Sequence, residues 1–289
     1  MSYSLTFKDG GFTLSAIDHF SPELIFDCGQ CFRFDKISED TYGGVALSRY
    51  ITVRSEQDGS FFITGFSEDE ARILADFFAL DDDYTAMRED ILSTMRKNGI
   101  STDIMEKAME AGRGIRILHQ EKFECICSFI ISQNNNIPRI KKIIDRLSYE
   151  FGEKFTSLEG EYYSFPTAKA LLEAGEEKIF ECKTGFRAKY LVSAATVCTD
   201  NFINELEALS DEELMKNLST VKGIGPKVGS CISLFSFGRL SFFPIDVWVR
   251  RVMEKYYPEN TSPEVFGAFA GLAQQYLFYY ERYISNSNK

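Results

Sequence analysis

The sequence predicts an α+β protein, in which an N-terminal antiparallel β-sheet domain with helices is followed by a mostly α-helical domain. Residues 1–65 contain short alternating runs rich in Val, Ile, Tyr and Phe, separated by Gly, Asp and Ser. Segments with a helical hydrophobic period follow. A Gly-Ile-Gly turn joins two helical segments of the second part. We therefore predict two domains, residues 1–115 and residues 116–289.

Each element has a local signal. The Asp58-Gly59 pair is typical of a hairpin between two strands. A Ser-x-x-Glu capping box opens the acidic helical segment Ser67–Asp83, and a second box at Ser210 precedes a helix that ends near Leu218. The predicted strands are Tyr3–Phe7, Phe32–Ile37, Thr41–Leu47, Tyr50–Arg54 and Phe61–Thr64, and the further predicted helices are Tyr84–Arg96, Thr102–Ala111, Lys122–Ser132, residues 138–151 and Val247–Tyr257.

Composition limits the class of protein. Hydrophobic residues make up 44% of the 289 residues, with 26 Phe and 14 Tyr, which indicates a well-packed globular chain. No apolar run approaches the ~18 residues of a membrane helix, and the first residues do not resemble a signal peptide. The seven cysteines show no disulfide framework. We therefore expect a protein of the reducing cytoplasm.

The net charge of −11 argues against nonspecific binding to nucleic acid, but the charge is unevenly distributed. Residues 1–118 carry 12 basic and 21 acidic side chains, whereas the remaining residues carry 20 and 22. The basic side chains of the second part either form one groove on an acidic body or are solvated helix faces. They cluster at Arg139, Lys141, Lys142, Arg146, Arg187, Lys189, Lys222, Lys227, Arg250, Arg251 and Lys255.

The turn at Gly223-Ile224-Gly225 lets the backbone approach a ligand closely, because glycine has no side chain. Pro226 suits the first position of the next helix, whose free amides favour a phosphate. This helix–hairpin–helix pattern is typical of a grip on a nucleic-acid backbone without reading of sequence. The alternative is an ordinary helix corner.

Lys227 and Asp246 are the candidate catalytic pair. Lys227 lies just after the hairpin on an apolar helix, where partial burial favours the neutral amine that forms a Schiff base. Asp246 directly precedes a helix, so we predict that it is an N-cap. A cap holds its carboxylate rigidly beside a reacting centre. Alternatively, Lys227 only binds phosphate and Asp246 is only a cap.

The Cys28-x-x-Cys31 pair permits half a zinc site or a redox pair. The sequence contains no second Cys-x-x-Cys, and both histidines are isolated. We therefore expect neither a metal nor an organic cofactor.

Four motifs together carry a resemblance to a known family. The segment VKGIGPKVGSC, followed by PIDV, resembles the helix–hairpin–helix, Gly/Pro…Asp superfamily of DNA glycosylases. Within it the chain is similar to the Ogg-type 8-oxoguanine DNA glycosylase/AP lyases, and the matches span nearly the whole chain in the family's order. The three further motifs are CGQCFRF, with Phe34 for the usual Trp, SQNNNIPRI at Ser132–Ile140, and AQQYLF at Ala273–Phe278.

The resemblance implies a pocket for an extruded base. The backbone carbonyl of Gly29 accepts a hydrogen bond from N7–H of 8-oxoguanine, a hydrogen that guanine lacks. Cys231 and Phe278 stack on the two faces of the base, and Gln274 pairs with its Watson–Crick edge. From the residues alone, Cys231 and Phe278 are equally well explained as core residues.

The resemblance also implies contacts to DNA. Both arginines of the family pattern are present, which predicts a preference for cytosine opposite the lesion, and each bidentate pair is worth about 1–3 kcal/mol of discrimination. Trp248 stands where relatives carry His near a phosphate, so this contact is expected to differ. The DNA-binding residues are Asn134, Arg139 and Arg187 at the estranged cytosine, Phe186 as the wedge where others have Tyr, and Gly223, Gly225 and Trp248 at the backbone.

The function implied is a bifunctional base-excision repair enzyme. It would flip out and excise 8-oxoguanine opposite cytosine through a Lys227 Schiff base and nick the abasic site by β-elimination. The absence of cysteines after Cys231 excludes the iron–sulfur branches of the superfamily. The alternatives are a glycosylase of the same fold for another damaged base and a non-catalytic DNA-binding module. We expect a monomer without obligate protein partner, associated with the nucleoid if the source is bacterial.

Overall fold

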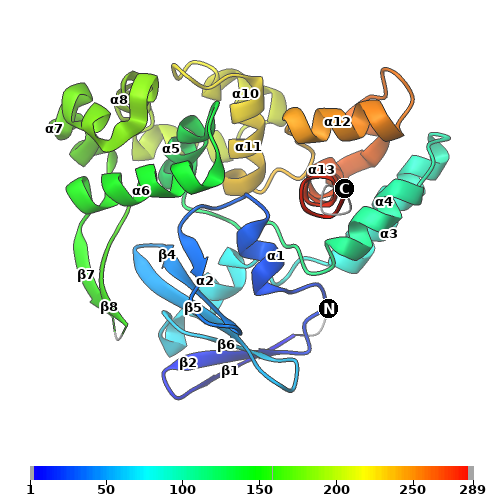
Figure 1. Cartoon of the computed structure of the whole chain (residues 1–289), viewed down its shortest axis with the longest axis horizontal. Coiled ribbons are helices and arrows are strands. Elements are labelled where there is room, and N and C mark those ends of the chain that lie inside the picture. Colours follow the sequence, from blue (N-terminus) through cyan, green and yellow to red (C-terminus); the bar gives the residue numbers. More distant parts are fainter. Residues whose placement is uncertain (1–2, 158, 286–289) are drawn as a thin grey trace.

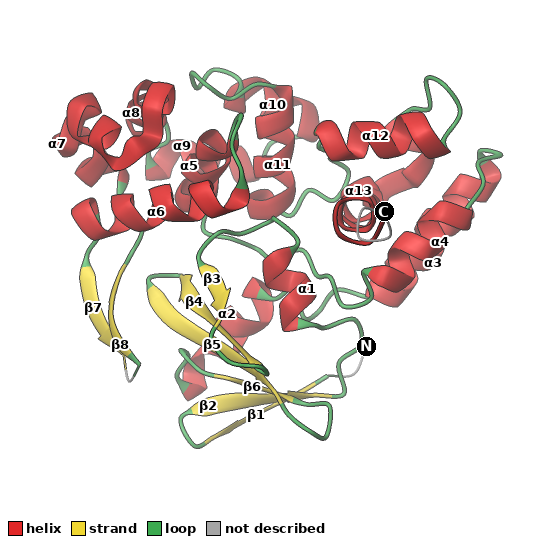
Figure 2. Ribbon diagram, viewed as in Figure 1, coloured by secondary structure: helices red, strands yellow, loops and turns green. Residues whose placement is uncertain are grey.

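The computed structural model describes residues 3–157 and 159–285 and divides into a sheet and a layer of helices (Figures 1 and 2). The sheet is six-stranded and antiparallel, with strand order β1-β2-β6-β5-β4-β3. The predicted N-terminal sheet is thereby confirmed. Its strands are β1 (Ser4–Lys8), β2 (Gly11–Ser15), β3 (Phe34–Lys36), β4 (Thr41–Ala46), β5 (Arg49–Ser55) and β6 (Phe61–Ile63).

One face of the sheet is buried by two short helices, α1 (Pro22–Asp27) and α2 (Ala71–Phe77). Alternate strand residues point to the same face, which explains why Ile51, Val53 and Ile63 are fully buried together. The rings of Phe26 and Phe34 stack on the same side, at 4.0 Å between centroids. This cluster is the core of the N-terminal part.

Strand β2 and helix α1 were not predicted. Asp9 and Gly10, with φ of 54° and 79°, form a two-residue turn that pairs β1 with β2. Helix α1 begins with Pro22 after the N-cap Ser21, whose hydroxyl accepts from the Leu24 amide. Both signals are local turn and cap patterns in a segment assigned only to strands and loops.

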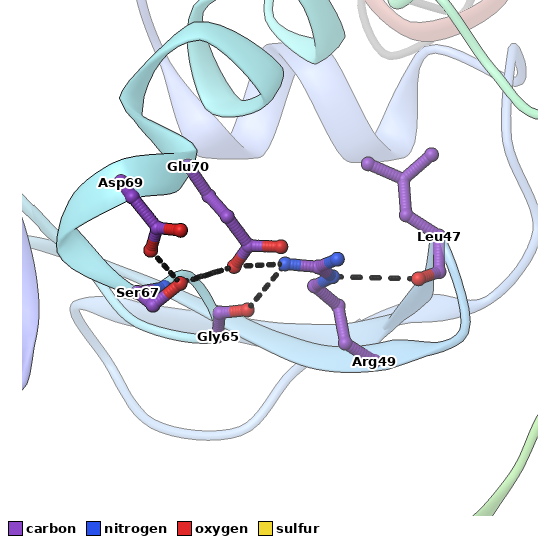
Figure 3. A network of polar contacts seen from close by, with 6 residues as sticks. All are labelled: Leu47, Arg49, Gly65, Ser67, Asp69 and Glu70. Carbon is purple, nitrogen blue, oxygen red and sulfur yellow. Dashed lines mark hydrogen bonds and ion pairs between the residues drawn. The ribbon is translucent and has the colours of Figure 1, made fainter.

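The predicted capping box at Ser67 is confirmed and lies next to an ion pair (Figure 3). Glu70 accepts from the Ser67 amide at 2.9 Å and from Arg49 at 2.6 Å. Arg49 also donates to the carbonyls of Leu47 and Gly65. The hydrogen bond from Arg49, together with those from the amide and hydroxyl of Ser67, lowers the pKa of Glu70 to about 2. This network joins strand β5 to the start of α2.

The helical part forms the second core, and it takes residues from both ends of the chain. Helices α3 and α4 pack against C-terminal elements, so they share a core with the residues around α13. The predicted boundary at residues 115 and 116 stays a prediction. The helices are α3 (Tyr84–Lys97), α4 (Asp103–Ala111), α5 (Lys122–Ser132), α6 (Ile137–Phe151), α7 (Ala168–Ile179), α8 (Ala188–Val197), α9 (Asp200–Glu207), α10 (Asp211–Leu218), α11 (Pro226–Phe237), α12 (Val247–Tyr256) and α13 (Ala270–Tyr279).

A hairpin of β7 (Lys154–Ser157) and β8 (Gly160–Tyr163), which was not predicted, descends from the helices along the sheet (Figure 1). Tyr162 stacks on Tyr50 at 3.9 Å between ring centroids. Arg33 donates to the carbonyl of Tyr163 at 2.5 Å. The hairpin therefore fastens the helical part to the sheet. Among the described helices, none is long and apolar enough to cross a membrane.

Candidate active site

A cleft of about 660 Å³ opens between the helices and the Cys28–Gly29 turn. Its walls come from α5, the asparagine loop before α6, the starts of α11 and α12, and α13. Segments that are far apart in the sequence thus meet in one place. Of the predicted site residues, the cleft brings together Gly29, Asn134, Gly225, Lys227, Cys231, Asp246, Trp248, Gln274 and Phe278.

The predicted helix–hairpin–helix is present as α10, a tight turn and α11. The capping box of Ser210 and Glu213 opens α10, and Pro226 occupies the first turn of α11, as predicted. Gly223 has a φ of 94°, and a side chain there would meet the ring of Tyr190 at 2.5 Å. Only glycine fits this turn.

Lys227 projects from the first turn of α11 into the cleft and is partly exposed. Its Nζ lies 5.6 Å from the centroid of the Phe129 ring. Burial raises the pKa of the Cys231 thiol, and the negative charge of Asp246 raises it further. The positive charge of Lys227 and a hydrogen bond from Lys227 to the thiol lower the same pKa. Cys231 therefore lies within electrostatic reach of both candidate catalytic groups.

Asp246 is the N-cap of α12, as predicted. Its Oδ1 accepts from the amides of Trp248 at 2.9 Å and Val249 at 2.8 Å. Among the described residues, none donates to Oδ2. One oxygen thus holds the carboxylate in place at the cleft, while the other remains available.

The Cys28–Gly29 turn is tied down on both sides. Gly29 has a φ of 82°, and a side chain there would lie 3.4 Å from the ring of Phe278. Gln30, fully buried, donates to the carbonyls of Ile25 and Arg116, both at 2.8 Å. From α13, Gln275 donates to the carbonyl of Cys28 at 2.7 Å. The main chain at Gly29 is therefore held beside the cleft.

Gln274 lies in the wall of the cleft with 4% of its surface exposed. Its Oε1 is buried and has no hydrogen-bond partner among the described residues. A buried carbonyl oxygen without a donor is costly, and such a group in a cleft is typical of a ligand contact.

Of the predicted site residues, Arg139, Phe186, Arg187 and Gly223 do not line the cleft. Arg187 lies behind the asparagine loop and is 2% exposed. Its guanidinium donates to the main-chain carbonyls of Gln133, Asn134 and Thr184. Burial lowers the pKa of Arg187, and the charge of Arg139 lowers it further. In the DNA-free protein, Arg187 therefore holds the asparagine loop.

Arg139 and Phe186 have the opposite character. Arg139 is exposed at the start of α6, and its guanidinium has no hydrogen bond or ion pair with a described residue. Phe186 is 48% exposed, with its ring 4.4 Å below the guanidinium carbon of Arg187. Asn134 is exposed with a φ of 47°. These side chains face outward beside Arg187.

Trp248, on the first turn of α12, lines the cleft. The guanidinium carbon of Arg251 lies 4.8 Å from the centroid of its ring. A neutral indole with a cation stacked on it thus stands at this position.

Three glutamines that position the site were not predicted as such: Gln30, Gln275 and Gln133. Gln133 donates to the carbonyl of Gly223 at 3.0 Å and so joins the asparagine loop to the hairpin. Each lies directly beside a predicted residue and inside one of the three motifs CGQCFRF, SQNNNIPRI and AQQYLF, which is the signal that the sequence offers. All seven cysteines are buried and free, and no described group of His, Cys, Asp and Glu is placed to hold a metal.

Two family models match the chain in succession. Residues 13–126 match the N-terminal domain of 8-oxoguanine DNA glycosylase. Residues 127–268 match the HhH-GPD superfamily of base excision DNA repair proteins. The matches follow one another without a gap and cover both parts of the fold.

Known proteins resemble the whole chain. An N-glycosylase/DNA lyase of Saccharomyces cerevisiae is 30% identical over an alignment of 262 residues, and the match covers 81% of this chain and 67% of that protein. The structure of MBOgg1 in complex with a low affinity DNA ligand matches at a TM-score of 0.90 with 35% identity, covering 100% of both chains. An 8-oxoguanine glycosylase/lyase of Clostridium acetobutylicum, in complex with dsDNA containing cytosine opposite 8-oxoG, matches at 0.89 with 33% identity, again over 100% of both chains. The resemblance drawn from the motifs is confirmed.

Proposed function

The chain belongs to the Ogg-type 8-oxoguanine DNA glycosylase/lyase family, and from that premise we propose that it flips 8-oxoguanine out of duplex DNA, excises it opposite cytosine and nicks the resulting abasic site. One observation carries the proposal. Lys227 and Asp246 line one cleft from the first turns of two helices, beside the unpaired carbonyl of Gln274.

The chemistry follows from these two groups. The neutral amine of Lys227 attacks C1′ as the bond from C1′ to the base breaks, and the base leaves with the bonding electrons and takes up a proton. Asp246 stabilises the positive charge that develops on the sugar and assists proton transfer. The adduct first loses a proton from its nitrogen, and the C1′–O4′ bond then opens, with O4′ taking up a proton, so that C1′ and the lysine nitrogen form a Schiff base. This Schiff base acidifies the hydrogen on C2′. Its loss expels the 3′ phosphate, which nicks the strand 3′ to the lesion.

Lesion recognition depends on the held turn at Gly29. A main-chain carbonyl accepts from N7–H of 8-oxoguanine but faces a lone pair of guanine, so the wrong base leaves a buried acceptor unpaired. Gln274, with its free Oε1, accepts from the Watson–Crick edge of the same base. Cys231 and Phe278 supply the stacking surfaces.

Opposite the lesion, Asn134, Arg139 and Arg187 contact the estranged cytosine, and Phe186 fills the space that the extruded nucleotide leaves. Arg139 and Phe186 are already exposed for this role. Arg187 has to exchange its carbonyl contacts for the base edge.

Borohydride trapping tests the proposal. The protein is incubated with a duplex that holds one 8-oxoguanine opposite cytosine, and borohydride is added to reduce any Schiff base. A denaturing gel is expected to show a covalent complex that is absent with an undamaged duplex and absent for Lys227→Gln. Lys222→Gln, which removes an exposed lysine of the same hairpin, is the matched control and should trap normally.

Free 8-oxoguanine without a trapped complex would show a monofunctional glycosylase and contradict the role of Lys227. If the lesion duplex yields neither a trapped complex nor free 8-oxoguanine, the protein is a glycosylase for another damaged base or a non-catalytic DNA-binding module.

A further inference from the structure

Three charged side chains line the cleft within the described part of the chain: Lys227, Asp246 and Arg282. The proposed chemistry uses the first two, on the sugar. It assigns nothing to Arg282, which lies half-buried at the cleft in the C-terminal segment that continues α13. Arg282 is therefore a charged group of the cleft without an assigned role.

Arg282 is held in place by aromatic rings. Its guanidinium carbon lies 5.5 Å from the centroid of the Phe278 ring and 5.2 Å from that of Tyr283. The Tyr283 hydroxyl donates to the carbonyl of Asp27 at 3.0 Å, which fixes that ring to the sheet part. Cation–π contact on two rings restricts the guanidinium without consuming its N–H donors.

Structural arginines of this protein behave differently. Arg116, 1% exposed, donates to main-chain carbonyls that include those of Phe78 and Asp18, and Arg187 donates to three more. For Arg282, no acceptor occurs among residues 3–157 and 159–285, and it forms no ion pair with Asp246. Its N–H donors are therefore available to a ligand in the cleft.

The ligand must be an anion that accompanies an extruded nucleotide. The base is neutral, whereas the phosphates on either side of the nucleotide each carry one negative charge. Guanidinium forks match the geometry of phosphate oxygens. Resting on the proposed function, we propose that Arg282 binds a phosphate that flanks the flipped 8-oxoguanine nucleotide.

The test removes the charge from either partner. Binding is measured in the Lys227→Gln background, so that the duplex stays intact, with and without Arg282→Met. The duplexes carry 8-oxoguanine and either normal phosphates or one neutral methylphosphonate on the 5′ or the 3′ side of the lesion. Arg282→Lys keeps the charge, and Arg96→Met removes an exposed arginine of α3 as a matched control.

With normal phosphates, Arg282→Met is expected to weaken binding about tenfold, the usual scale for a hydrogen bond to a charged group. The slope of log K against log salt should become shallower by about 0.9. One methylphosphonate should weaken the parent by a similar factor and leave the Arg282→Met protein nearly unaffected. Arg282→Lys should recover part of the affinity, and Arg96→Met should bind as the parent does.

Equal binding by Arg282→Met and its parent would overturn the inference. The inference would also be overturned if Arg282→Met binds more weakly but is still weakened by a methylphosphonate as much as its parent is, because Arg282 would then contact the base and not a phosphate. Release of 8-oxoguanine by the wild-type protein is measured alongside. If release fails, the proposed function fails. If release succeeds but the methylphosphonates weaken the parent and the Arg282→Met protein equally, only the proposed role of Arg282 is contradicted.

Discussion

The two ends of the cleft differ in how many of their polar groups already have hydrogen-bond partners in the free protein. At the end nearest α13, Asp246 has one oxygen without a donor among the described residues, and Gln274 has a buried carbonyl without one. At the other end the asparagine loop lines the cleft, and behind that loop Arg187 gives its donors to main-chain carbonyls. The first end is ready for a ligand, whereas the second must exchange internal contacts for external ones.

The difference carries a cost and a benefit. A group that waits unpaired destabilises the free protein but binds without rearrangement. A group that is engaged stabilises the free protein, and its contact with a base adds only the difference between two sets of hydrogen bonds. Removing an unpaired group should therefore lower activity without a loss of stability, whereas removing an engaged group should lower the free energy of unfolding as well.

The largest effect is expected at Asp246. Asp246→Ala should slow single-turnover base excision by about 10²–10³-fold and cost about 1 kcal/mol of stability, because both the charge and the N-cap are lost. Asp246→Asn should lose the rate but keep the stability, since an amide oxygen still accepts from Trp248 and Val249. Urea unfolding and excision assays measure the two effects. An active Asn variant would show that the carboxylate is only a cap.

Arg187→Ala should lower the free energy of unfolding by about 2–3 kcal/mol, because three buried or partly buried carbonyls lose their donor. The preference for cytosine opposite the lesion should fall with it. Urea unfolding measures the first effect, and excision from duplexes with each opposite base measures the second. Unchanged stability would contradict a structural role for this arginine in the free protein.

Arg139→Ala is the counterpart at an exposed arginine outside the cleft. Its exposed guanidinium has no described partner, so stability should change by less than about 0.5 kcal/mol. Discrimination between cytosine and adenine opposite the lesion should fall by about 1–3 kcal/mol. The same two assays apply. Equal stability losses for Arg139→Ala and Arg187→Ala would remove the contrast between them.

The smallest effect, and the one of opposite sign, is expected at Gln274. Gln274→Met removes a buried oxygen that has no donor, so the free energy of unfolding should rise by up to about 1 kcal/mol. Excision of 8-oxoguanine should fall at the same time. Thermal unfolding and excision kinetics measure the pair of changes. A destabilised variant would show that Oε1 is satisfied in solution.

Local signals explain what could be predicted from the sequence. Helix starts at Ser210, Pro226 and Asp246 are set by neighbouring residues, so the hairpin and the N-cap of α12 were predicted correctly. Strand β2 and helix α1 also have local signals, the Asp9-Gly10 turn and the Ser21 N-cap, so both elements are predictable from neighbouring residues.

Contacts between distant segments could not be predicted in this way. Gln275 meets Cys28, 247 residues away, and Gln30 meets Arg116, 86 residues away. Whether Arg187 faces DNA or its own main chain depends equally on packing, because its sequence neighbours are the same in both cases. The proximity of Lys227 and Cys231 follows from their four-residue spacing on one helix, whereas the approach of Asp246 to Cys231 required the fold.

The two hydrophobic cores exchange members across the chain: Cys28 and Phe32 belong to the helical core, and Leu118 belongs to the core under the sheet. A cut between the segments matched by the two family models would leave every buried member of the sheet core in the first fragment, but it would divide the helical core and run through α5. Separate expression of either half should yield an incompletely folded product, whereas co-expression of both halves should allow each to complete the other. The active cleft is thus a property of the undivided polypeptide, although its two catalytic side chains both come from the second half.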